Sequence, residues 1–155
     1  ELEACRAAGV TVQICPGITA ASAGAAALGA SLTLRGTARK LTFVTAHARK
    51  GEVLDLDWKS LADPHATLAV YMGKAAAREV SRQLIAAGLP GETAVALVEN
   101  ASLPDQRSFH TRLDLLPLAA RTALGDGPAL LLIGAAMEPR TAAAIRAERA
   151  VFSRA

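Results

Sequence analysis

Short apolar runs alternate along this chain with segments whose apolar residues have helical spacing. Each run is rich in Val, Leu or Ile and ends near Gly, Pro or a charged residue, which is typical of strands. Strands are expected at residues 10–14, 41–45, 67–73, 94–99, 108–113 and 129–134. Helices are expected at residues 1–9, 19–28, 54–61, 74–87, 115–124 and 141–152. This alternation predicts an α/β fold, a sheet covered by helices on both faces. A hairpin-like pattern around residues 100–108 makes the expected sheet mixed, mostly parallel.

The pattern changes most sharply within residues 10–22. A β-branched run breaks at Pro16-Gly17, and a run of small, helix-forming residues follows. Thr19 is placed to cap the new helix, and the small side chains from Ala20 onward leave space close to the backbone. Open α/β sheets bind small ligands at turns after the carboxyl ends of strands. The segment is therefore a candidate ligand turn, although a plain strand–helix connection is the commoner outcome of such a pattern.

Composition and charge narrow the possible functions. The 155 residues suffice for one domain with a core, and because only 3% are aromatic, that core must consist of Ala, Leu, Val and Ile. The net charge of +3 is spread along the chain, without basic runs interleaved with aromatic residues. We therefore expect no nucleic-acid partner, whereas a mild positive field favours a small acidic substrate.

Two cysteines and the absence of targeting signals complete this picture. Cys5 and Cys15 match no metal or redox spacing, so we expect packed side chains and no metal site. The sequence shows no signal peptide and no apolar run long enough to span a bilayer. These features predict a soluble, cytoplasmic protein without a membrane partner.

Seven short segments, taken in order, resemble one known family. Three of them end predicted strands or begin the helices that follow: Pro16-Gly17-Ile18-Thr19-Ala20-Ala21-Ser22, Tyr71-Met72-Gly73 and Ala96-Leu97-Val98-Glu99-Asn100-Ala101. The others are Leu32-Thr33-Leu34-Arg35, Thr45-Ala46-His47, Leu56-Asp57-Trp58 and Asp105-Gln106-Arg107. Each segment alone is unspecific, but their order and spacing resemble the S-adenosylmethionine-dependent tetrapyrrole methylases. The similarity extends from Glu1 to about Ile133.

The resemblance implies a domain organisation. Members of the family have two α/β domains, bind the cofactor in the cleft between them and form homodimers. Residues 1–36 would be the remnant of the N-terminal domain plus a linker, and residues 37–155 the C-terminal domain. The family's glycine-rich loops and its acid/base residues match no part of this chain. We therefore assign no catalytic residue and expect the chain to be inactive alone.

The resemblance also implies four contacts with the cofactor, S-adenosyl-L-methionine, whose product form is S-adenosyl-L-homocysteine. Thr19 and Ala20 match the pair that contacts the methionine or ribose portion. Met72 matches a methionine that packs on the adenosine. Ala101 lies where many relatives have glycine, and its main chain would contact the adenine.

Arg35 is the residue that the resemblance assigns to the tetrapyrrole substrate. It matches the arginine of a Leu-Thr-His-Arg motif, and its guanidinium could bind a substrate carboxylate through two hydrogen bonds. Leu34 and Gly36 replace the usual histidine and aspartate beside it. Without the resemblance, Arg35 would be a solvated linker residue and Met72 a core methionine.

The implied activity is the C-methylation of uroporphyrinogen III to precorrin-2. A sulfonium methyl group is already electrophilic, so the protein must align it with a pyrrole carbon and exclude water, without a protein nucleophile or a metal. Two alternatives stay open. One is a methyltransferase acting on a later corrin precursor, and the other is a non-catalytic dimerisation domain.

Overall fold

The computed structural model describes residues 1–47 and 54–139. Five of the six predicted strands are present, with bounds within two residues of those expected: β1 (Lys40–Thr45), β2 (Ala66–Tyr71), β3 (Ala94–Glu99), β4 (Arg107–Arg112) and β5 (Ala129–Ile133). The helices are α1 (Leu2–Ala7), α2 (Ala20–Leu28), α3 (Trp58–Leu61), α4 (Ala77–Ala86) and α5 (Leu116–Thr122), with 3-10 turns η1 (Leu113–Leu115) and η2 (Ala135–Met137). The helix expected at 141–152 lies outside the described residues.

The five strands form one mixed sheet in the order β1-β2-β5-β3-β4. The expected α/β fold with a mixed sheet is confirmed, but the expectation that the sheet is mostly parallel is wrong. Only β1 and β2 pair in parallel, whereas β2–β5, β5–β3 and β3–β4 are antiparallel. The last strand inserts between β2 and β3 and runs against both. Its apolar run is buried on both faces of the sheet, so the sequence shows that it is central without showing its direction.

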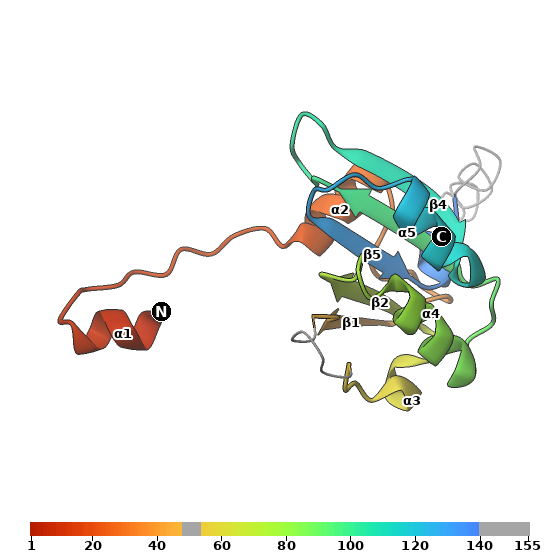
Figure 1. Cartoon of the computed structure of the whole chain (residues 1–155), viewed down its shortest axis with the longest axis horizontal. Helices are drawn as coiled ribbons and strands as arrows, with labels where there is room; N and C mark the ends of the chain where they lie inside the picture. The colour runs from red at the N-terminus through yellow and green to blue at the C-terminus, as the bar shows by residue number, and fades with distance from the viewer. Residues whose placement is uncertain (48–53, 140–155) are drawn as a thin grey trace, which may run out of the picture.

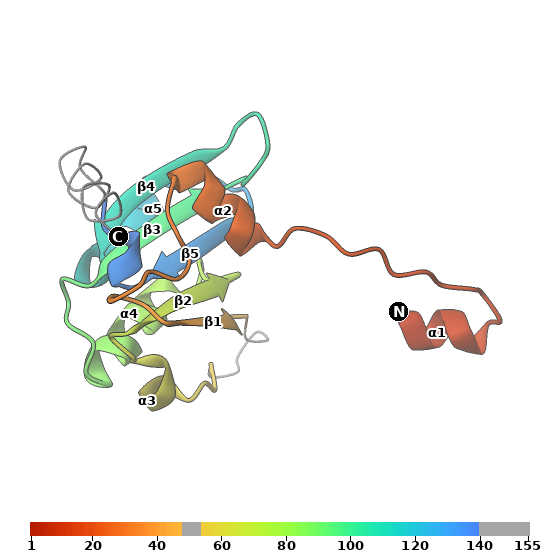
Figure 2. The same ribbon diagram turned by 180° about the vertical axis from the view of Figure 1, so that it is seen from behind.

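Helices cover both faces of the sheet, as Figures 1 and 2 show from opposite sides. On one face, α4 and α5 pack with large side chains such as Leu84, Leu97 and Leu116, all fully buried. On the other face, small residues such as Ala69 and Ala96 leave room for α2. Gly24 lies at the close approach of α2, where an added Cβ would lie 3.2 Å from Leu130 Cδ2.

Residues 10–14 do not form the expected strand. This segment is extended, and Val10, Val12 and Ile14 are 55%, 41% and 76% exposed. Figure 1 shows it joining α1 to α2 at a distance from the sheet. A strand needs a neighbour to accept and donate its backbone hydrogen bonds, and no described residue pairs with this segment. Cys15 is exposed with it, so the expectation of a packed side chain is wrong for this cysteine.

Two further elements differ from the expected ones. The helix expected at 54–61 is limited to α3, where Asp57 Oδ1 accepts a hydrogen bond from the Ser60 N–H at 3.2 Å. The strand expected to be buried at 41–45 is β1, which lies at the edge of the sheet and has only exposed and half-buried residues. Within the described parts of the chain, no helix is long and apolar enough to cross a bilayer.

Candidate functional site

The first part of the candidate site is the N-terminus of α2. Thr19 has extended backbone (φ −72°, ψ 152°), and its Oγ1 accepts a hydrogen bond from the Ser22 N–H at 3.1 Å. This bond satisfies one of the free N–H groups at the start of the helix. The expected capping role of Thr19 is thereby confirmed, and Ala20 becomes the first residue of the helix.

The second part is the turn that follows β2. Met72 has φ +54°, a left-handed conformation that is rare outside glycine, and its side chain is 55% exposed. Gly73 comes next, and a Cβ there would lie 2.6 Å from Leu131 Cδ1. Just before the turn, Tyr71 Oη accepts a hydrogen bond from the Ala21 N–H at 3.1 Å. This bond joins the start of α2 to the end of β2.

The third part is the loop between β3 and β4. Two of its residues, Asn100 (φ +53°) and Ser102 (φ +69°), are left-handed and flank Ala101. The Asn100 N–H donates to Pro128 O at 3.0 Å, and its side-chain amide donates to Asp105 Oδ2 at 2.6 Å. The first bond holds the loop against the residue before β5, and the second joins two residues of the loop itself.

These three turns meet at one cavity. Ala20, Met72 and Ala101 all line a cavity of about 240 Å³ at the carboxyl ends of β2 and β3. Most of its remaining lining is apolar; the other lining residues are Tyr71, Val98, Asn100, Leu103, Pro128, Ala129 and Leu130. Turns from three distant parts of the sequence thus form one continuous surface. That these residues contact a cofactor remains a prediction.

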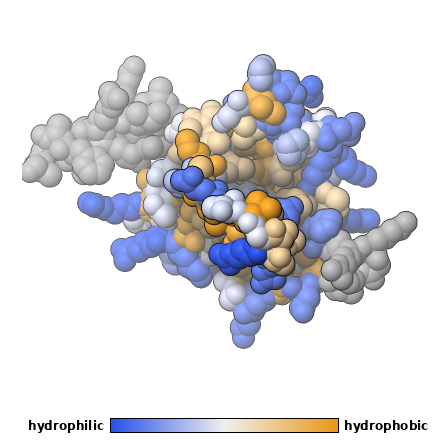
Figure 3. Space-filling view, turned by 90° about the vertical axis from the view of Figure 1, so that its left-hand side faces the viewer, coloured by the Kyte–Doolittle hydropathy of each residue, from blue (hydrophilic) through white to orange (hydrophobic). Residues whose placement is uncertain are grey.

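Thr19 lies beside this cavity rather than in it. It lines a neighbouring hollow of about 580 Å³ together with Ser22, Ser102 and Gln106. Ser102 adjoins Ala101, so the two hollows border the same loop. Figure 3 views the molecule from the side toward which the strands β1 and β2 end in Figure 1, and α1 with the extended segment after it projects toward the viewer there.

Arg35 lies elsewhere. It is exposed within a turn closed by the bridge between Leu34 and Ala38, just before β1 begins. Since β1 and β2 run in parallel, this turn is at the opposite end of the sheet from Met72. A six-residue strand spans roughly 20 Å. The structure therefore does not bring Arg35 into the cavity with Ala20, Met72 and Ala101.

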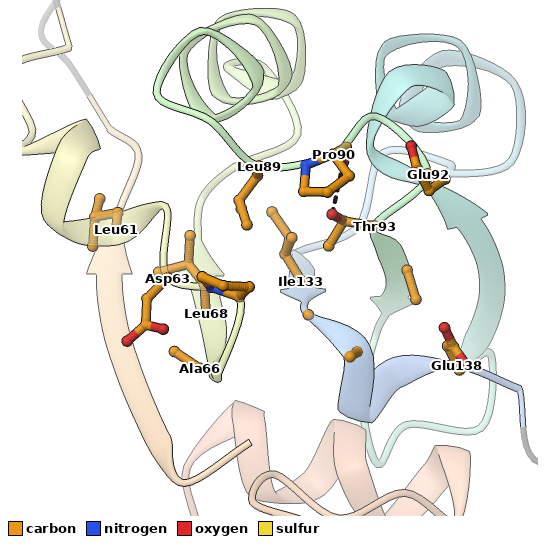
Figure 4. Close-up of a pocket in the computed structure, with 14 residues that line it drawn as sticks. Leu61, Asp63, Ala66, Leu68, Leu89, Pro90, Glu92, Thr93, Ile133 and Glu138 are labelled. Atoms are coloured by element: carbon orange, nitrogen blue, oxygen red, sulfur yellow. Dashed lines mark hydrogen bonds between the residues drawn. The ribbon is translucent and has the colours of Figure 1, made fainter. Parts of the chain in front are cut away.

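A second cavity, of about 200 Å³, lies at the opposite end of the sheet (Figure 4). Leu68, Leu89 and Ile133 contribute apolar side chains to it, and Asp63 lies at one side. The hydrogen bond from the His65 N–H, at 2.9 Å, lowers the pKa of the Asp63 carboxyl, and Lys40 at 3.5 Å lowers it further. This aspartate has a local structural partner, so we assign no binding role to this cavity.

Sequence reasoning missed one polar residue that lines the first cavity, Tyr71, and one that lies outside its lining, Glu99. Tyr71 was grouped with its segment, but its hydroxyl contact with α2 joins positions 50 residues apart and has no local signature. Glu99 closes an apolar run and is only 2% exposed, and a charge ending such a run was a signal that could have been used. In the described residues, no group of three or more His, Cys, Asp or Glu side chains is arranged to hold a metal ion.

The comparison with known proteins identifies the family. The profile described as Tetrapyrrole (Corrin/Porphyrin) Methylases matches residues 1–117. The chain belongs to this family. A siroheme synthase of Gluconacetobacter diazotrophicus is 44% identical over 140 residues, which is 90% of this chain and 30% of that protein. A uroporphyrinogen-III C-methyltransferase of Paracoccus denitrificans is 43% identical over 135 residues, 86% of this chain and 47% of that protein. The tetrapyrrole methylase chain thus spans less than half of the length of these two relatives.

Solved structures of tetrapyrrole methyltransferases share the fold. A cobalt precorrin-4 methyltransferase, described as a cobalamin biosynthetic enzyme, superposes with a TM-score of 0.79 at 28% identity. The match covers 89% of this chain and 58% of the precorrin-4 methyltransferase chain. The uroporphyrin-III C-methyltransferase of Thermus thermophilus, complexed with S-adenosylhomocysteine, superposes with a TM-score of 0.70 at 29% identity. That match covers 87% of this chain and 57% of the Thermus chain.

Proposed function

We propose that this tetrapyrrole methylase chain forms part of an S-adenosylmethionine-dependent enzyme that methylates uroporphyrinogen III to precorrin-2. The observation that supports this most strongly is the convergence of Ala20, Met72 and Ala101 on one cavity. A relative with the same fold is described in complex with S-adenosylhomocysteine. The 43% identity to a uroporphyrinogen-III C-methyltransferase favours this substrate.

The residues around the cavity fit such a cofactor. The lining is mainly apolar, which suits a nucleoside face, and Tyr71 and Asn100 add polar atoms. At Gly73 the missing side chain lets the turn approach Leu131 closely, which holds the Met72 backbone at the rim. When bound, the cofactor would supply an electrophilic methyl group on its sulfonium. The residues of this chain would bind and orient it and exclude water, which provides the alignment that such a transfer needs.

We further propose that residues 1–36 belong to an N-terminal domain with its linker and residues 37–155 to a C-terminal domain, in a protein that forms a homodimer. The exposed α1 and residues 10–14 support the first part, since they pack against no described residue of the sheet. Helix α2 would then join the two domains, because Ala21 and Ala25 are buried on the sheet. Arg35 remains our proposed substrate contact, from a position outside the cavity.

The test uses the full-length enzyme that contains this chain. Ala20→Leu places a larger side chain at the cavity, and we expect the affinity for S-adenosylhomocysteine, measured by calorimetry, to fall about tenfold. Ala86→Leu makes the same change on an exposed helical alanine of α4 and should leave the affinity unchanged. Equal affinities of the two variants would contradict the proposed cofactor site.

A second candidate function is methylation of a later corrin precursor. It is favoured by the TM-score of 0.79 to the cobalt precorrin-4 methyltransferase, against 0.70 to the Thermus enzyme. Assaying the full-length protein with both substrates separates the two, and turnover of the later precursor alone would reject uroporphyrinogen III. A non-catalytic dimerisation domain would turn over neither.

A further inference from the structure

The last residue of β3 is a buried carboxylate with unusual partners. Glu99 is 2% exposed, and each of its two oxygens accepts a backbone hydrogen bond. Oε2 accepts from the Gly125 N–H at 2.9 Å, and Oε1 accepts from the Gly127 N–H at 3.0 Å. Hydrogen bonds to an ionised group are about twice as strong as those between neutral groups. Glu99 therefore holds the loop at residues 125–128, which leads into β5.

That loop forms one side of the proposed cofactor cavity. Pro128 and Ala129 line the cavity, and Pro128 O accepts the hydrogen bond from the Asn100 N–H. Asn100 also lines the cavity and precedes Ala101. The carboxylate thus lies behind the cavity, bonded to a loop that lines it and adjacent in sequence to the residues of another lining turn.

Both glycines of the loop leave room for neighbouring side chains. A Cβ at Gly125 would lie 3.3 Å from each carboxylate oxygen of Glu99, and a Cβ at Gly127 would overlap the Asn100 side chain. On the outer side, Lys74 Nζ donates a hydrogen bond to Gly125 O and lies 3.8 Å from Asp126 Oδ1. Lys74 follows the Met72-Gly73 turn. The loop is therefore bonded to the ends of both β2 and β3.

We propose that Glu99 is a positioning residue for the cofactor cavity, acting by fixing the loop at residues 125–128 against the turns that contain Met72 and Ala101. This rests on the proposed function. In the described chain the Gly125 and Gly127 N–H groups have Glu99 as their hydrogen-bond partner. A neutral side chain cannot accept both bonds with the same strength, so the loop loses its fixed position without the carboxylate.

The first experiment compares Glu99→Gln with Ser81→Ala in the full-length enzyme. The glutamine keeps the shape and one acceptor oxygen but replaces the other with a donor. Ser81 is also buried, 4% exposed, and its hydroxyl donates to Leu113 O at 2.6 Å, away from the cavity. We expect Glu99→Gln to bind S-adenosylhomocysteine about tenfold more weakly and to raise KM for S-adenosylmethionine more than it lowers kcat. Ser81→Ala should leave affinity and KM unchanged.

Amide exchange tests the same proposal locally. In Glu99→Gln, the amides of Gly125 and Gly127 should exchange at least tenfold faster, whereas those of β3 should change no more than in Ser81→Ala. Lys74→Met loosens the same loop from its outer side, where the lysine side chain is 33% exposed, and should also weaken cofactor binding. This second variant keeps the test decisive if Glu99→Gln does not fold.

The outcomes separate this proposal from the one on which it rests. Wild-type enzyme that fails to bind S-adenosylhomocysteine would reject the proposed function. Wild-type binding with unchanged affinity in both Glu99→Gln and Lys74→Met would instead overturn the role of Glu99, and show that the carboxylate serves stability alone.

Discussion

Three residues other than glycine have left-handed backbone in the described chain, and all three lie in the turns around the candidate site. They are Met72, Asn100 and Ser102, with φ of +54°, +53° and +69°. Each such residue costs of order 1–3 kcal/mol unless the surrounding structure compensates. Asn100 is held by two hydrogen bonds and Ser102 by one from its N–H to Gln106 Oε1 at 2.7 Å. Strained residues gathered around the cavity and the hollow beside it support a binding role for this region.

The lowered pKa of Asp63 predicts how the stability of the protein depends on pH. Its pKa in the folded protein is lowered by the His65 N–H first and by Lys40 second, with desolvation opposing them. A carboxyl with a lowered folded pKa contributes stability above its unfolded pKa and loses it as the pH falls through the folded pKa. Asp63→Asn should therefore be less stable than wild type at pH 7; this difference should begin to shrink as the pH falls toward about 4, the ordinary pKa of the unfolded carboxyl, and vanish only below the lower folded pKa. Urea unfolding from pH 7 to pH 2 measures it.

The contribution of Lys40 to this effect should depend on salt. The Lys40 side chain is 53% exposed, so its attraction to Asp63 is screened, whereas the bond from the His65 N–H is not. Raising the salt concentration should reduce the stability difference between wild type and Asp63→Asn at pH 7 without abolishing it. A difference that stayed constant between pH 7 and pH 2 would contradict this account.

The position of β5 between two strands depends on how it ends. Gly134 follows β5 with φ +138°, and its N–H donates to Ala94 O at 2.9 Å. A Cβ there would lie 2.5 Å from the backbone oxygen of Ala66, the first residue of β2. Because this neighbour is backbone, it cannot move aside without disturbing the pairing of β2 with β5.

Gly134→Ala should therefore destabilise the protein by roughly 2–4 kcal/mol, combining backbone strain with overpacking. Gly88→Ala is the matched control, since Gly88 also has positive φ (+112°) but has no atom within 4 Å of the added Cβ. Gly88→Ala should lower the free energy of unfolding by about 1–2 kcal/mol, from backbone conformation alone. Urea unfolding of both variants measures the two costs. Equal costs would show that the close contact with Ala66 is not limiting.

Most helices and strands of this fold have a local signature in the sequence. The order of the strands in the sheet has no such signature. The helical spacing of Ala77, Val80, Leu84 and Ile85 predicts α4, and the first three are buried, whereas Ile85 is 38% exposed. Gly29 follows the last residue of α2 with φ +61°. Residues 10–14 have the same β-branched signature as true strands but lack a pairing partner. Pairing is a long-range property, so the same pattern predicted one strand too many.

Over the whole molecule, the sheet and its helices should be far more stable than residues 1–18. Every described residue of β3 is buried, whereas Ile14 and Ile18 are 76% and 84% exposed. Hydrogen exchange of the 155-residue chain should find amides at residues 10–18 nearly unprotected and those of β3 the slowest. Slow exchange at residues 10–14 would instead show that this segment pairs with another copy of the chain.

The identities and spacing of the residues were enough to predict most of the described helices and strands, the capping Thr19 and the set of turns that resembles the methylase family, because each depends on near neighbours in the chain. The sheet order, the antiparallel insertion of β5 and the separation of Arg35 from the cavity became visible only in three dimensions. So did the backbone hydrogen bonds that Tyr71 and Glu99 accept, which join positions 50 and 26 to 28 residues apart. Such contacts depend on how complete elements pack together, and no local pattern encodes that packing.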